Sequence, residues 1–264
     1  MPLSLRTVDT IPEARAVLAT GQARYLGGGT LAVRAANEGD LSFDTLVRVA
    51  DPSLGTVNVT GGRARLGASV TMSAILRHPE LGDIAPAARA IGGPAVRTVA
   101  TVGGNLFAPT PYGDFVVALL ALGAVVETDG GTMALDEFLL LRGRFDGIVA
   151  AVEFALPATG TFRFAKVSRV KPKGLSVLSI AAVIETDADG TVTAARIALG
   201  CMADRPVRAE KAEAALMGAK LTPDGVAAAV VAVSHGIRPA TDPIASKWYR
   251  REVLPVHFRR LLLG

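Results

Sequence analysis

Two short glycine-rich segments place the strongest constraint on how this chain folds. The first, residues 25–30, reads Tyr-Leu-Gly-Gly-Gly-Thr and lies between an apolar stretch and a helix-compatible one. The second, residues 101–105, reads Thr-Val-Gly-Gly-Asn and also has apolar surroundings. Consecutive glycines leave the backbone unshielded and permit positive φ angles, so successive N–H groups can point into one concavity and hold an anion. The pair therefore predicts two loops that hold two adjacent phosphates of one ligand from both sides.

Each segment alone also has simpler explanations. Gly27, Gly29 and Ala32 match the relaxed dinucleotide-binding fingerprint. Asp44 and Asp51 both lie near the offset at which that fingerprint expects an acidic residue. A phosphate-binding P-loop is excluded, because no Lys followed by Ser or Thr closes the segment. A tight structural turn is the better explanation for either segment in isolation, so only the pair favours a ligand site.

The composition excludes several classes of function. Half of the 264 residues are apolar, which is enough for a large core, and a net charge of +4 does not indicate nucleic-acid binding. Cys201 is the only cysteine, so the chain forms no internal disulfide and binds no iron–sulfur cluster by itself. The three histidines lack the spacing of metal ligands. The longest apolar run, residues 115–126, is too short to span a membrane, and no signal-peptide pattern is present, so we expect a cytoplasmic protein.

Local signals predict individual elements. Thr10 and Glu13 have the spacing of a capping box at the start of a helix. Asp114 is the predicted N-cap of a helix over residues 115–122. Turns at residues 61–62 and 187–190 separate alternating apolar stretches and therefore predict two β-hairpins.

The chain divides into an α/β region followed by a small sheet and helices. A change of composition near residues 157–160 is the best candidate for a domain boundary. We therefore expect domains over residues 1–157 and 158–264, the first with subdomains of about 1–53 and 54–157. The last helices are expected over residues 207–217, 223–235 and 245–262.

Motifs along nearly the whole chain match one known pattern. The most specific part is residues 96–105, where Arg97 precedes the Thr-Val-Gly-Gly-Asn motif. The segment 26–30 and Asp114 complete the pattern in the first region. Three later segments continue it, at residues 164–169, 196–208 and 239–250. In these motifs the chain closely resembles the FAD-binding medium subunit of molybdenum hydroxylases, the family of xanthine dehydrogenase and carbon monoxide dehydrogenase.

The resemblance implies an α+β fold and a cofactor site. The expected fold is the FAD-binding vanillyl-alcohol-oxidase (PCMH) type with two α/β subdomains, followed by a C-terminal domain with a small antiparallel sheet and a helical bundle. The FAD pyrophosphate would lie between the two glycine segments. Ile91 would pack on the cofactor, Asp114 would hold a polar group, and Lys166 would lie near the flavin edge, unless it points outward from an exposed strand. The implied cofactor-binding residues are Tyr25, Leu26, Gly27, Gly28, Gly29, Thr30, Leu31, Ile91, Thr101, Gly103, Gly104, Asn105, Asp114 and Lys166. No catalytic residue and no metal ligand is expected in this chain.

Some features depart from the family or stand outside it. Residues 171–174 read Lys-Pro-Lys-Gly where many relatives have an acidic residue, which puts a flavin contact there in doubt. The cysteine-rich insertion of one reductase branch is absent from the sequence. The largely basic segment from Lys247 onward is either a solvated helix face or a docking surface for partner subunits. Trp248 and Cys201 are expected to be packed rather than chemically active.

The resemblance also implies a role within a complex. The chain would carry FAD and pass electrons from [2Fe–2S] clusters on a small partner subunit to NAD⁺, oxygen or another acceptor. A large partner subunit would hold the molybdenum cofactor and the substrate, and the whole would be a dimer of heterotrimers. Two alternatives remain open, a self-contained FAD-dependent reductase and a non-redox binding or assembly protein. The first would need its own proton donor near the flavin, and the sequence shows no convincing acid–base constellation.

Overall fold

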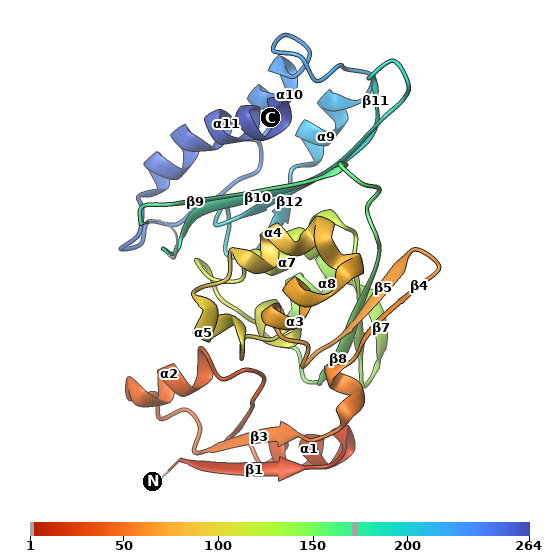
Figure 1. Ribbon diagram of the computed structural model, residues 1–264. Coiled ribbons are helices and arrows are strands. Elements are labelled where there is room, and N and C mark those ends of the chain that lie inside the picture. Colours follow the sequence, from red (N-terminus) through yellow and green to blue (C-terminus); the bar gives the residue numbers. More distant parts are fainter. Residues whose placement is uncertain (1–2, 171–173) are drawn as a thin grey trace.

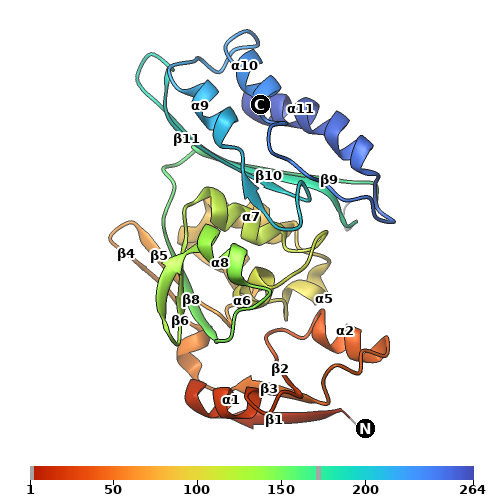
Figure 2. The ribbon, with the colours of Figure 1, turned by 180° about the vertical axis from the view of Figure 1, so that it is seen from behind.

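The computed structural model describes residues 3–170 and 174–264, so most of the Lys-Pro-Lys-Gly departure lies outside the described residues. Three separate sheets succeed one another along the molecule, and helices pack between and around them (Figure 1). Seen from behind, the same order is clear, with the N-terminal sheet at one end and the C-terminal helices at the other (Figure 2). Within the described residues, no helix is both long and apolar enough to cross a membrane.

The N-terminal sheet has three parallel strands in the order β1-β3-β2. Its strands are β1 (Ser4–Val8), β2 (Ala23–Tyr25) and β3 (Thr45–Val49). Helix α1 (Ile11–Leu18) begins with the predicted capping box, in which Thr10 accepts from the backbone of Glu13 and the Glu13 side chain accepts in return. Helix α2 (Ala32–Asn37) follows the first glycine segment. The core of this unit is small and includes Val47 and Val49 of the central strand.

The central unit has a five-stranded antiparallel sheet in the order β4-β5-β8-β6-β7. The predicted hairpin over β4 and β5 is confirmed, with Val57 opposite Leu66. The strands are β4 (Val57–Thr60), β5 (Arg63–Gly67), β6 (Val125–Thr128), β7 (Gly131–Ala134) and β8 (Val149–Ala155). The helices of this unit are α3 (Met72–Arg77), α4 (Ala85–Arg89), α5 (Pro94–Arg97), α6 (Val102–Leu106), α7 (Asp114–Ala121) and α8 (Leu135–Leu141), with 3-10 turns η1 (Pro52–Gly55) and η2 (Pro79–Ile84).

The C-terminal sheet has four antiparallel strands in the order β12-β11-β10-β9, and the predicted second hairpin is its β10–β11 pair. These strands are β9 (Phe162–Ser168), β10 (Ser176–Thr186), β11 (Val192–Gly200) and β12 (Val207–Arg208). Helices α9 (Glu210–Leu216), α10 (Ala227–Ala232) and α11 (Lys247–Leu263) cover one face, and α4 and α7 lie against the other (Figure 1). Every residue of α7 is buried because the helix packs against β10 and β11 of this sheet and against α4, α6 and α8 of the central unit.

Several local expectations were wrong. The helix expected over residues 207–217 begins only at Glu210, because Val207 and Arg208 pair with β11 as a strand. Gly113, with φ of 84°, is the N-cap of α7, and the Asp114 side chain makes no capping hydrogen bond. Trp248 is 67% exposed rather than packed, whereas Cys201 is buried as expected. Arg250, in the same helix α11, is fully buried and donates to the carbonyls of Val177 and Ala240.

Candidate functional site

The two glycine segments lie directly against each other, although they come from different units of the fold. A Cβ atom at Gly28 would be 1.8 Å from the carbonyl oxygen of Val99 and 3.0 Å from the Cα atom of Ala100. A Cβ atom at Gly27 would be 2.9 Å from Oγ1 of Thr101. Any side chain at Gly28 would therefore overlap backbone atoms, and only glycine allows this contact. The structure thus brings together the two segments that the sequence singled out.

The first segment presents free backbone donors. Within it, the N–H of Leu26 donates to the Val47 carbonyl at 2.7 Å. Among the described residues, none accepts a hydrogen bond from the backbone N–H of residues 27–31. Only Gly29 has a positive φ, 73°, so the other two glycines are needed for close approach rather than for conformation. Consecutive half-buried N–H groups without a protein acceptor are the chemistry of an anion cradle.

The second segment is a short helix rather than the expected loop. Thr101 is the N-cap of α6, and its Oγ1 accepts from the Gly104 N–H at 3.1 Å. The Gly103 N–H donates to the Ala68 carbonyl at 2.8 Å, and a Cβ atom there would be 3.0 Å from that same oxygen. The backbone N–H groups of residues 102–105 are therefore already used inside the protein. What the segment offers a ligand is side-chain chemistry, because the Oδ1 atom of Asn105 is buried and has no hydrogen-bond partner in the described structure.

Asp114 and Lys166, predicted separately, form one buried ion pair. The Lys166 ammonium lies 2.9 Å from Oδ2 of Asp114, and the two side chains are 14% and 6% exposed. The Ser176 hydroxyl donates to Oδ1 of Asp114 at 2.6 Å. The Lys166 ammonium also donates to the Ala90 carbonyl at 2.9 Å, next to Ile91. Lys166 therefore does not point outward from an exposed strand, and the alternative considered for it is wrong.

Two residues of this neighbourhood had no strong sequence signal. Ser176 lies in the apolar start of β10, where nothing in the pattern marks one hydroxyl among the buried residues. Cys201 donates its thiol to the Ser176 carbonyl at 3.5 Å. Burial, and next the negative charge of Asp114, raise the pKa of the Cys201 thiol to about 12. The thiol therefore stays protonated and acts as a packed group rather than as a nucleophile.

The remaining predicted site residues lie around the first segment. Tyr25 ends β2 with its ring partly in the N-terminal core, and burial raises the pKa of its hydroxyl. Leu31 occupies the N-cap position of α2 without a side-chain capping bond. From α2, Arg34 donates to the hydroxyl of Tyr112 at 2.9 Å, which also joins the N-terminal unit to the central unit.

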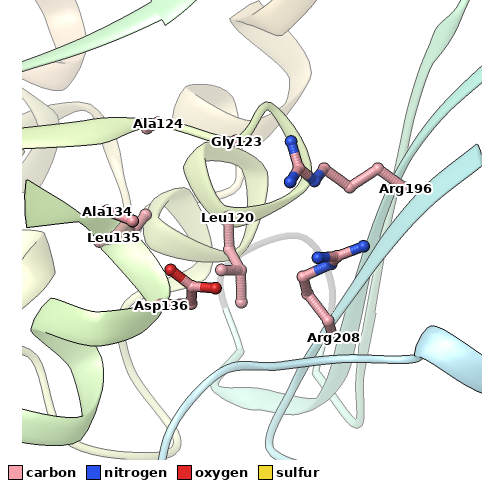
Figure 3. Close-up of a pocket in the computed structure, with 8 residues that line it drawn as sticks. All are labelled: Leu120, Gly123, Ala124, Ala134, Leu135, Asp136, Arg196 and Arg208. Carbon is pink, nitrogen blue, oxygen red and sulfur yellow. The ribbon is translucent and has the colours of Figure 1, made fainter.

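A small cavity lies elsewhere, between the central unit and the C-terminal sheet. It has a volume of about 100 Å³ and is lined by the end of α7, the start of α8 and two arginines, Arg196 and Arg208 (Figure 3). Arg208 is already paired with Glu213. No residue of either glycine segment lines this cavity. In residues 3–170 and 174–264, no group of three or more His, Cys, Asp or Glu side chains is placed to hold a metal ion.

Comparison with known proteins gives a consistent result. The family model of the FAD binding domain in molybdopterin dehydrogenase matches residues 3–155, and that of the CO dehydrogenase flavoprotein C-terminal domain matches residues 163–264. The nicotinate dehydrogenase FAD-subunit of Eubacterium barkeri is 27% identical over 78% of this chain and 75% of its own length. The carbon monoxide dehydrogenase medium chain of Afipia carboxidovorans is 27% identical over 74% of this chain and 72% of its own length.

A solved structure extends the similarity to the whole fold. A chain of the carbon monoxide dehydrogenase from Hydrogenophaga pseudoflava, in a form that lacks the Mo-pyranopterin moiety of the molybdenum cofactor, superposes with a TM-score of 0.90 at 26% identity. The match covers 99% of this chain and 96% of that chain. The expected α+β fold, a PCMH-type FAD-binding part followed by a flavoprotein C-terminal part, is therefore confirmed. The chain belongs to the family of FAD-binding subunits of molybdenum hydroxylases, and it is an oxidoreductase subunit with FAD as its cofactor.

Proposed function

We propose that this chain is the electron-transfer subunit of a molybdenum hydroxylase complex and holds FAD where its two glycine segments meet. The observation that carries the proposal is the free donor row of residues 27–31, which packs against the segment that contains the buried, unpartnered Oδ1 atom of Asn105. The row would hold the pyrophosphate by backbone hydrogen bonds, as anion cradles do. The hydroxyl of Thr101 and the amide of Asn105 would add side-chain hydrogen bonds to the cofactor from the start of α6. When bound, FAD supplies a centre that accepts electrons singly and releases them as a pair.

The other predicted site residues complete this proposal. Tyr25 and Leu26 precede the donor row and Leu31 ends it, and these three residues would enclose the cofactor from the N-terminal unit. Gly103 and Gly104 allow α6 to pack closely on its surroundings and so set the position of Asn105. Ile91 would pack on the cofactor, and the pair of Asp114 and Lys166 would lie behind it. We assign no catalytic residue, because the chain's task is to bind, orient and shield the cofactor.

The partners are part of the proposal. One cysteine cannot ligate an iron–sulfur cluster, so clusters that feed the cofactor must lie on another chain. We propose a small iron–sulfur subunit and a large molybdenum-cofactor subunit, assembled as a dimer of heterotrimers in the cytoplasm. NAD⁺, oxygen or another acceptor would take the electrons from FAD. The relatives named as an FAD-subunit and as a medium chain support this subunit role.

We also propose the division into residues 1–157 and 158–264, with subdomains of about 1–53 and 54–157. The order of the sheets supports it, because β8 of the central sheet ends at Ala155 and β9 of the C-terminal sheet begins at Phe162. Each sheet is built from strands that are consecutive in the sequence, and no strand of one part belongs to the sheet of another. Separate expression of the two parts, followed by a test for soluble folded protein, examines the boundary.

An absorption spectrum of the native purified protein, with its subunits separated on a denaturing gel, tests the proposed function. We expect a flavin spectrum overlaid with iron–sulfur absorption, and two additional chains. Flavin on a single chain with turnover of its own would instead indicate the self-contained reductase. A chain that binds no FAD even after reconstitution would refute the cofactor assignment.

A further inference from the structure

A closed loop joins the second glycine segment to α7; it comprises residues 106–113 and is called here the 106–113 loop. Asn105 lies directly before it and Asp114 directly after it. A Cβ atom at Gly113, whose φ is 84°, would be 3.3 Å from the Asn105 carbonyl oxygen, so the two ends of the loop lie against each other. The shape of the loop therefore decides how Asn105 and Asp114, both predicted cofactor-binding residues, are placed relative to each other.

The 106–113 loop has little regular backbone structure of its own. It reads Leu-Phe-Ala-Pro-Thr-Pro-Tyr-Gly, and its two prolines have no N–H to donate. Its backbone turns back on itself through hydrogen bonds from Ala108 to the Asn105 carbonyl at 3.2 Å and from Tyr112 to the Pro109 carbonyl at 2.8 Å. Groups outside the loop must therefore help to fix its shape.

Arg142, the C-cap residue of α8, fastens the start of the loop. One of its nitrogens donates to the carbonyls of Leu106 at 3.3 Å and Ala108 at 3.2 Å. Carbonyls at the end of a helix such as α6 lack intrahelical partners, and a cation satisfies them. The guanidinium is half-buried, and this burial lowers its pKa. Hydrogen bonds from a charged donor are stronger in such surroundings than in water.

The same guanidinium ties the loop to the C-terminal part of the chain. Its other terminal nitrogen donates to the carbonyl of Asp204 at 3.1 Å. Asp204 lies between β11 and β12, in the segment that matches the flavoprotein C-terminal domain. The Asp204 carbonyl also accepts from the Thr110 hydroxyl of the loop at 3.5 Å. One side chain thus joins α8, the 106–113 loop and the C-terminal sheet.

We propose that Arg142 is a positioning residue of the FAD site, which fastens the 106–113 loop and through it the relative placement of Asn105 and Asp114. This inference rests on the proposed function, because these two residues matter here as groups that hold FAD. It also couples the FAD site to the C-terminal sheet through the Asp204 carbonyl. A guanidinium has five N–H donors and the three carbonyls use three of them, so the test must separate positioning from direct contact with the cofactor.

The test uses the full chain and the variant Arg142→Met, which keeps much of the aliphatic stem and removes every donor. The matched control is Arg163→Met in β9. Arg163 also donates from one nitrogen to two carbonyls at a helix end, those of Leu261 and Leu262 in α11, and burial lowers its pKa in the same way. Arg142→Lys keeps the charge but loses the planar fork of donors.

Three quantities are measured on each variant: the urea midpoint, amide hydrogen exchange without FAD, and the dissociation constant for FAD. The amides of Ala108 and Tyr112 donate to the Asn105 and Pro109 carbonyls and report on the loop. In Arg142→Met we expect their exchange to be about tenfold faster and FAD to bind about tenfold more weakly, because hydrogen bonds to a charged group are lost. Arg163→Met should lower the urea midpoint to a similar extent without changing either value. In Arg142→Lys the exchange should be about threefold faster.

Each departure from this pattern contradicts the proposal. Weaker FAD binding with unchanged exchange in the loop would show that Arg142 contacts the cofactor directly. Faster exchange with unchanged affinity would show that the FAD site does not depend on the shape of the loop. An equal loss of affinity in Arg163→Met would assign the effect to the stability of the whole chain.

Two further results keep the test decisive. If Arg142→Met does not fold, Arg142→Lys decides, because one ammonium cannot span the carbonyls of Leu106, Ala108 and Asp204 as the fork does; unchanged exchange in that variant refutes the proposal. Absence of FAD binding in the unmodified chain would refute the proposed function, while exchange in the chain without FAD would still decide whether Arg142 fastens the loop.

Discussion

Replacing Gly28 with alanine tests whether the contact between the glycine segments builds the cofactor site. The added Cβ atom would lie 1.8 Å from the Val99 oxygen, 2.6 Å from the Val99 carbon and 3.0 Å from the Ala100 Cα atom. All three are backbone atoms, so no side chain can rotate away. Restoring ordinary contact distances requires the segments to separate by roughly 1.5 to 2 Å. Overpacking of this kind costs about 1–3 kcal/mol. The cost lowers the free energy of FAD binding, because FAD has to contact both segments and so must bring them back together.

A penalty of this size weakens FAD binding by roughly 10- to 100-fold, since each 1.4 kcal/mol changes a dissociation constant about tenfold. Titration of the apo chain with FAD, followed by flavin fluorescence, measures it directly. Gly55→Ala is the matched control, because its φ is not positive and a Cβ atom there meets nothing within 4 Å. We expect the control to bind like the unmodified chain. Unmodified affinity in Gly28→Ala would show that the cofactor does not need the two segments in contact, and the site would have to be placed elsewhere.

Three further predictions concern the buried polar groups. Asp114→Asn leaves the Lys166 ammonium buried without its counter-charge and should lower the free energy of unfolding by about 3 kcal/mol, measured by urea denaturation; an unchanged midpoint would contradict the ion pair. The raised pKa of the Cys201 thiol, about 12, predicts negligible labelling by iodoacetamide at pH 8 in the folded chain and ready labelling after unfolding. Burial alone would raise the pKa of Asp242, but hydrogen bonds from Arg250 and two backbone N–H groups lower it overall. Its stabilising contribution is therefore present above the pKa of the unfolded carboxyl, about 4, and is lost as the pH falls through the lower folded value; Asp242→Asn should flatten that part of the pH dependence of the urea midpoint.

The parts of the fold that were predictable from sequence are those decided by local chemistry. The hairpin of β4 and β5 follows from a two-glycine turn between alternating stretches, and both glycines have the positive φ that such turns need. The capping box of α1 is likewise decided within four residues. Val207 and Arg208 were assigned wrongly to a helix, because their strand structure comes from pairing with Ala198 and Leu199 of β11, which the pattern of residues 207–217 does not encode. A helix-compatible sequence carries no signal that its first residues will pair with the edge of a sheet instead.

The candidate site shows the same division. Both glycine segments could be identified as unusual backbone, but their mutual contact and their different roles could not. The helical form of α6 depends on the Ala68 carbonyl, which accepts from Gly103 across the fold and packs against it. Ser176 was missed because one serine in an apolar strand has no distinguishing pattern, and only the tertiary structure places it against Asp114.

The two glycine segments contribute different groups to the candidate site, and this difference leads to one more prediction. The free donors of residues 27–31 belong to the N-terminal unit, whereas Asn105 belongs to the central one, so a complete site exists only while the two are docked. Apart from the glycine contacts, the hydrogen bond from Arg34 to Tyr112 and the ion pairs of Arg15 with Asp129 and Asp146 also cross this junction. A ligand that binds only the docked form stabilises docking by mass action, by about 2.7 kcal/mol at a hundredfold excess over its dissociation constant. We therefore expect removal of FAD to speed hydrogen exchange in β2 and α2 well before it affects the fully buried helix α7. Equal loss of protection in all three elements would mean that the cofactor stabilises the chain as one cooperative unit and that the junction is not its weak point.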